Sequence, residues 1–238
     1  MTAPIIIGAG SNTNGFAANA HGNSNTRVFS NISIPANANT VFIQVGFDSA
    51  LGARNITSAT YTGLSGHTEL FNVDPTPAEN VKITRFVALD VSNCDAATIE
   101  VTMTLSSAST SKGICGVVCT EGFIQNVTLT CDRLLETHKL MVHQGNEENT
   151  TLLSMGIMDE DQSVLAFSGT GVTELYKVDE TTINCFASSQ STTVNGFKTI
   201  NISSDNNADD VAHAIILLSS QLDPFDGITG KLTSPIIK

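Results

Sequence analysis

The sequence predicts an all-β protein: two tandem antiparallel β-sandwich lobes of jelly-roll-like type, built from an internal repeat. Composition, alternation and the repeat predict this class. Ser, Thr and Asn supply 72 of the 238 residues (23, 29 and 20), and only 14% of the residues are charged. Ser, Thr and Asn compete with the backbone for hydrogen bonds in helices, so they favour strands and turns. The hydrophobic content of 41% is sufficient for buried cores.

Short runs rich in Val, Ile, Thr and Phe alternate between apolar and polar residues, which is typical of strands with one buried face. The segment 99–105, with the sequence IEVTMTL, shows this alternation. Clusters of Gly, Asn, Asp and Pro separate the runs at intervals typical of antiparallel hairpins. One segment, Cys131–Gln144, is ambiguous, because Asp132 could cap a short helix there.

The internal repeat is clearest where segment 66–76, GHTELFNVDPT, recurs as 171–181, GVTELYKVDET, with seven of eleven positions identical. Weaker matches keep the same order on both sides. They are 31–34 with 126–129, 39–47 with 149–157, 98–102 with 199–203, and 113–119 with 211–218. We therefore predict one lobe at 26–124 and another at 125–222, with an extra piece near 131–148 in the second.

An N-terminal arm, residues 1–25, and a C-terminal tail, residues 223–238, lie outside the predicted lobes. Both ends carry a similar apolar motif, TAPII at 2–6 and TSPII at 233–237. A proline followed by β-branched residues favours an extended segment that docks on another surface. The candidate docking residues are Pro4, Ile5, Ile6, Pro235, Ile236 and Ile237. The alternative, that each end packs back on its own lobe, stays open.

The charge balance bears on possible partners. Eleven basic and 23 acidic residues give a net charge of −12, and no basic run could track phosphates, so we expect no direct binding of nucleic acid. We also expect no membrane span and no signal peptide, because neither apolar pattern is present. Five cysteines without regular spacing indicate reduced thiols rather than a disulfide framework.

The residues that could support nucleophilic or metal chemistry are better explained structurally. On a strand, Cys115 and Cys119 would lie about 13 Å apart, too far for one zinc ion or a disulfide, so we interpret them as core residues. The histidines lack metal-binding spacings, and His213 lies in an apolar run that predicts a core position. Segment 63–66, GLSG, lacks one spacer of the nucleophile elbow and is interpreted as a turn.

Carboxylates could support glycoside hydrolysis or calcium binding. Glu69 with Asp74 and Glu174 with Asp179 are repeated pairs, and their duplication favours a structural role. The acidic segments 159–161 and 205–210 lack the pattern of a calcium loop, which favours solvated hairpin tips. We therefore predict no catalytic, cofactor or metal site and no enzyme activity.

Segment 55–64, NITSATYTGL, followed by a hydrophobic strand and later by ATIEVT at 97–102, resembles a pattern in β-sandwich virion proteins of tailed bacteriophages. In that family a strand and turn of this type precede a "t-a-t-v-t-v" strand, and the unit is often repeated. The resemblance touches most of 22–222. It implies a virion component, such as a capsid decoration (cement) protein or a part of the tail or fibre.

We therefore expect a non-enzymatic virion structural protein, made in the host cytoplasm, which decorates the capsid. Its expected partners are the major capsid protein or other virion proteins and further copies of itself. Two alternatives remain at this point. One is a receptor- or carbohydrate-binding module of a tail fibre, which would usually expose aromatic platforms. The other is a small double jelly-roll coat protein.

Overall fold

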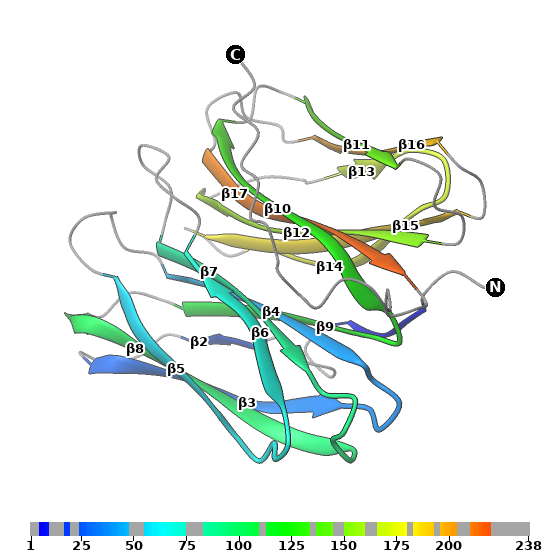
Figure 1. Cartoon of the computed structure of the whole chain (residues 1–238). Coiled ribbons are helices and arrows are strands. Elements are labelled where there is room, and N and C mark those ends of the chain that lie inside the picture. The colour runs from blue at the N-terminus through cyan, green and yellow to red at the C-terminus, as the bar shows by residue number, and fades with distance from the viewer. Residues whose placement is uncertain are drawn as a thin grey trace.

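A computed structural model describes residues 5–9, 17–19, 24–47, 55–74, 83–109, 113–133, 137–144, 150–159, 166–179, 183–192, 196–203 and 210–219. These residues form antiparallel strands and turns, with no helix among them, so the predicted all-β class is confirmed (Figure 1).

The first lobe contains a large sheet and a small one. The large sheet comprises β1 (Ile6–Ala9), β2 (Ala17–Asn19), β4 (Thr40–Phe47), β6 (Thr68–Val73), β7 (Ile83–Asp90) and β9 (Gly113–Thr120). Its order is β1-β9-β4-β7-β6, with β2 also paired with β9. The small sheet has the order β3-β8-β5, with β3 at Ser24–Ile34, β5 at Ile56–Thr62 and β8 at Ala97–Ser109. An apolar core lies between the sheets, where Phe29 and Val101 of the small sheet share a buried cluster with Ile43, Phe47 and Cys115 of the large one.

The second lobe repeats this arrangement. Its large sheet comprises β10 (Phe123–Arg133), β12 (Thr150–Asp159), β14 (Val172–Asp179), β15 (Asn184–Thr192) and β17 (Asp210–Ser219), in the order β10-β17-β12-β15-β14. Its small sheet has the order β11-β16-β13, with β11 at Thr137–Gln144, β13 at Ala166–Ser168 and β16 at Gly196–Ser203.

The two lobes have the same strand order. The path β9-β4-β7-β6 corresponds to β17-β12-β15-β14, the path β3-β8-β5 corresponds to β11-β16-β13, and β1 takes the place of β10 at the sheet edge. Between most successive strands of a large sheet the chain passes through a strand of the small sheet, as β3 does between β1 and β4 and β11 does between β10 and β12. These crossings give the sandwich its jelly-roll-like character.

This strand order corrects part of the sequence alignment. Segment 31–34 lies in β3 but its predicted match, 126–129, lies in β10, which has a different place in its lobe. Val45 belongs to the first-lobe core, whereas its predicted match, Met155, belongs to the cluster between the lobes. The segment near 131–148 holds the end of β10 and all of β11, the counterpart of β3, so it is not an extra piece. A helix capped by Asp132 is also wrong, because Asp132 lies in β10.

The large sheets of the two lobes pack face to face, so the molecule has four β layers (Figure 1). Phe42 and Val118 of the first lobe share one buried cluster with Met155, Cys185 and Ile216 of the second. Every residue of β4 and β9 is buried, because successive residues point to opposite faces and both faces are covered. For this reason the sequences of these two strands are largely apolar and show no alternation of apolar and polar residues.

The strongest part of the sequence repeat encodes a turn and a bulge. Gly66 and Gly171 have φ angles of 82° and 72°, a conformation that costs glycine little. The strands that follow, β6 and β14, each shift register between the repeated glutamate and the aromatic residue, at Glu69/Phe71 and Glu174/Tyr176. The repeated glycines and the positions after the repeated glutamates therefore shape the sheet edges.

Candidate docking site and the junction between the lobes

The N-terminal segment belongs to the large sheet of the first lobe. In β1, Ile6 is the register partner of Thr120 and Gly8 is that of Cys119. Ile6 packs against the cluster between the lobes, and Ile7 packs against the first-lobe core. Ile6, one of the predicted docking residues, is therefore half-buried in its own chain.

Ile5 differs from the residues that follow it. Among the side chains that the structure describes, it is the one large hydrophobic that is exposed, with 53% of its surface accessible. Its backbone oxygen accepts a hydrogen bond from the Glu121 N–H at 3.0 Å. The chain thus fixes the backbone of Ile5 while it presents the side chain to solvent.

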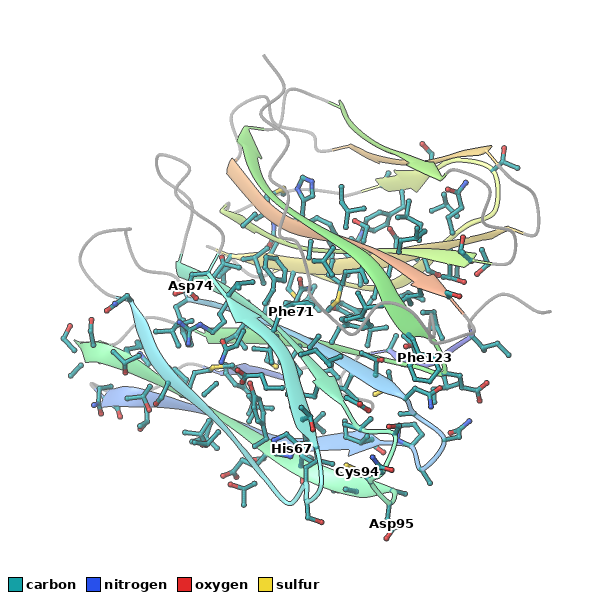
Figure 2. The ribbon with its side chains drawn as sticks, viewed as in Figure 1. His67, Phe71, Asp74, Cys94, Asp95 and Phe123 are labelled. Carbon is teal, nitrogen blue, oxygen red and sulfur yellow. The ribbon has the colours of Figure 1, made fainter. Side chains whose placement is uncertain are left out.

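The backbone around Ile5 is held at the connection between the lobes, Glu121–Gly122. The hydroxyls of Thr40 and Thr120 donate to the Gly122 oxygen at 2.9 and 3.2 Å. The Asn37 amide donates to the Glu121 carboxylate. Phe123, half-buried, begins β10 beside this connection (Figure 2). An exposed isoleucine, a carboxylate and a partly exposed aromatic ring therefore lie near one another where the two lobes meet.

The other predicted docking residues, Pro4, Pro235, Ile236 and Ile237, lie outside the described residues. Docking through these four residues consequently remains a prediction from sequence.

No family model, curated protein or solved structure matches the chain. Within the described ranges there is also no helix of the length and apolarity that a membrane span requires.

A polar group of residues joins the two lobes, and no pattern in the sequence predicts it. The Gln44 amide nitrogen, on β4, donates to the Tyr176 hydroxyl at 2.7 Å, the Cys185 sulfur at 3.0 Å and the Phe186 oxygen at 2.8 Å. Gln44 is fully buried in an otherwise apolar interface. We call Gln44, Tyr176 and Cys185 the interlobe latch. Because a buried amide needs its partners, the latch fixes the register of the two sheets.

Gly116 makes room for the latch. A Cβ atom at this position would lie 2.2 Å from the Tyr176 hydroxyl oxygen and 2.8 Å from the Cys185 sulfur. Gly46 has a similar role, since its Cβ would lie 2.8 Å from a methyl group of Ile157. Gly46 and Gly116 therefore leave space on the first-lobe sheet for side chains of the second lobe.

Burial keeps the buried thiols and the Tyr176 hydroxyl protonated at neutral pH. Burial raises the pKa of Cys185 to about 12, although hydrogen bonds from Gln44 and Tyr176 act in the other direction. Burial also raises the pKa of Cys119 to about 12, and it raises the pKa values of Cys115 and Tyr176 well above their ordinary ranges. The predicted core positions of Cys115 and Cys119 are confirmed, since both are buried.

The structure describes the side chains of most of the repeated carboxylates, but not all of them. Asp74 forms a two-point ion pair with Arg85, at 2.6 Å to Nε and 2.8 Å to Nη2, and Arg85 also donates to the Ile56 oxygen (Figure 2). Glu69 accepts from the Asn72 amide. These contacts give Asp74 and Glu69 structural roles. The side chain of Asp179 lies outside the described residues.

Replacing Asp74 with alanine is expected to lower the free energy of unfolding by about 1 kcal/mol, because the pair is bidentate but Asp74 is partly exposed. Chemical denaturation should measure the change. Glu174→Ala is the matched control, since this exposed carboxylate forms no ion pair with the described residues. Equal effects of both substitutions would contradict the structural role of Asp74.

The remaining candidates also have structural positions. His213 is buried, as predicted. Segment 63–66 connects β5 to β6 with glycines at positive φ, so its interpretation as a turn is confirmed. The Cys94 thiol donates to the Ser65 oxygen at 3.1 Å, and burial raises its pKa. The acidic segments 159–161 and 205–210 fall largely outside the described ranges, within which no three candidate ligands gather for a metal ion.

Proposed function

We propose that the protein is a non-enzymatic structural component of a virion: a capsid decoration protein, made in the host cytoplasm, that binds the coat shell and its own neighbours. The observation that carries this proposal is Ile5, an exposed isoleucine on a fixed backbone at the head of β1. A hydrophobic side chain that is already positioned loses little conformational freedom on binding, so it is a suitable anchor for a protein surface.

The stacking of the lobes supports a structural role. β9 and β10 are joined by only Glu121 and Gly122, and the interlobe latch adds buried hydrogen bonds across the interface. A rigid body of four layers keeps its docking surfaces at fixed distances. Such preorganisation favours a protein that bridges neighbouring subunits of a shell.

The tyrosines weigh against the carbohydrate-binding alternative. Tyr176 is only 4% exposed and is committed to the interlobe latch, and Tyr61 packs against the first-lobe core. Neither tyrosine offers the open ring face on which a sugar would stack.

Replacing Ile5 with aspartate is expected to weaken binding to empty coat shells by about tenfold or more, because a charge would replace the apolar anchor. Cosedimentation of purified protein with shells that lack it measures the bound fraction. Thr173→Asp, an exposed position on β14, adds the same charge elsewhere and should leave binding unchanged.

Undiminished binding of the Ile5 variant would refute Ile5 as the anchor. Closed shells formed by the protein alone would instead support the double jelly-roll coat protein, and the decoration role would then be wrong.

A further inference from the structure

The outer edge of β11 is long and regular. β11 pairs with β16 through eight consecutive residue pairs, from Thr137 with Ser203 to Gln144 with Gly196, without a register shift. β16 lies between β11 and β13, so the other side of β11 has no strand partner among the described strands. This edge offers about 27 Å of backbone donors and acceptors. It belongs to the layer farthest from the first lobe (Figure 1).

The other edge strands are interrupted. Apart from the three-residue strands β2 and β13, every other described strand at a sheet edge shifts register against its neighbour. These shifts occur in β1 at Ile6/Gly8, β3 at Phe29/Ile32, β5 at Ile56/Ser58, β6 at Glu69/Phe71, β10 at Ile124/Asn126 and β14 at Glu174/Tyr176. Bulges twist an edge and hinder pairing with another chain. β11 lacks this protection.

Charge also distinguishes β11. The chain has a net charge of −12, so two copies repel each other over most approaches. The sequence of β11, THKLMVHQ, contains one lysine, two histidines and no carboxylate. Its neighbour β16, GFKTINIS, contains one lysine and no carboxylate. The strands along this edge therefore add lysines and no carboxylate to a contact between two copies.

From this geometry we infer that two copies of the chain pair antiparallel through β11, so that their three-stranded sheets form one continuous six-stranded sheet. Pairing by backbone hydrogen bonds at an open edge is a recurrent mode of association, and a two-fold axis makes the contact identical on both sides. The inference extends the self-association part of the proposed function. Its test uses no coat shell, so it can fail independently of shell binding.

The two-fold axis limits the register. In an antiparallel ladder, hydrogen-bonded and non-hydrogen-bonded residue pairs alternate, so two adjacent pairs are never equivalent. A two-fold axis must therefore pass through the middle of one pair, in which a residue faces the same residue of the other copy. Maximal overlap of an eight-residue strand then centres on Leu140 or Met141. Lys139 faces Met141 in the first register and His143 in the second. Neither register places lysine opposite lysine, which would disfavour pairing.

Sedimentation velocity of the full chain at pH 8 over a concentration series tests the inference. We expect a monomer–dimer equilibrium, which Met141→Lys should weaken by about tenfold, because the new lysine faces Lys139 in one register and itself in the other. Met141 lies on the same strand face as Lys139, two residues away. Thr173→Lys, on the bulged edge strand β14, adds the same charge and should not weaken the dimer.

Amide hydrogen exchange of wild-type protein provides a readout that does not depend on a variant. Exchange within 137–144 should slow as the concentration rises through the dimerisation range. A wild-type chain that stays monomeric would overturn the inference. So would a dimer whose exchange in 137–144 is independent of concentration, as expected if the C-terminal tail covers this edge.

Discussion

Replacing Gly116 with alanine is expected to lower the free energy of unfolding by roughly 3 kcal/mol, and the melting temperature by about 6–12 °C. The added methyl would lie 2.2 Å from the Tyr176 hydroxyl oxygen and 2.6 Å from the ring carbon that bears it. Tyr176 is buried between two sheets and cannot move aside without breaking the interlobe latch. Chemical and thermal denaturation measure the loss.

Gly8→Ala is the matched control, because a Cβ there would meet its nearest neighbour at an ordinary 3.6 Å. This substitution should be close to neutral. Combining Gly116→Ala with Tyr176→Leu should cost less than the sum of the two single changes, since the leucine lacks the hydroxyl and ring carbon that the added methyl would strike. A stable Gly116→Ala variant would contradict the tight packing of the lobes.

The protein is expected to lose stability steeply above pH 9. Cys119 and Cys185 have pKa values near 12 in the folded state, against about 9 for an ordinary thiol. A raised pKa means that these groups contribute their full stabilisation below pH 9. Between pH 9 and 12 the unfolded chain loses these protons while the folded chain retains them. Each such group should therefore reduce stability by about 1.4 kcal/mol per pH unit in this window.

Urea denaturation at pH steps from 8 to 11 measures this slope. Cys119→Val removes one titrating thiol from the first-lobe core and should flatten the slope by about 1.4 kcal/mol per pH unit. A pH-independent free energy of unfolding over this range would show that the thiols are not buried as described.

The strand content and the turn chemistry could be predicted from local sequence. Alternation in 99–105 correctly predicts part of β8, and the paired glycines in 63–66 correctly predict a turn. The recurrence of GxTEL reflects a shared turn and bulge, so this part of the repeat has a clear structural meaning. Such features depend on residues close together in the chain.

The packing of the lobes could not be predicted, because it depends on residues far apart in the chain. Gln44 lies in the apolar run VFIQVGF, where nothing signals that its partner is Tyr176, 132 positions away. The match of 39–47 with 149–157 joins corresponding strands in the wrong register for a related reason. A strand buried on both faces tolerates apolar residues at every position, so its sequence does not fix which residues face the core and which face the other lobe.

The proposal of a capsid decoration protein is tested most directly by measuring the mass of empty coat shells with and without added wild-type protein. A capsid decoration protein should give a saturable increase in shell mass that corresponds to a fixed number of copies per shell. A protein that leaves the shell mass unchanged at saturating concentration would contradict it.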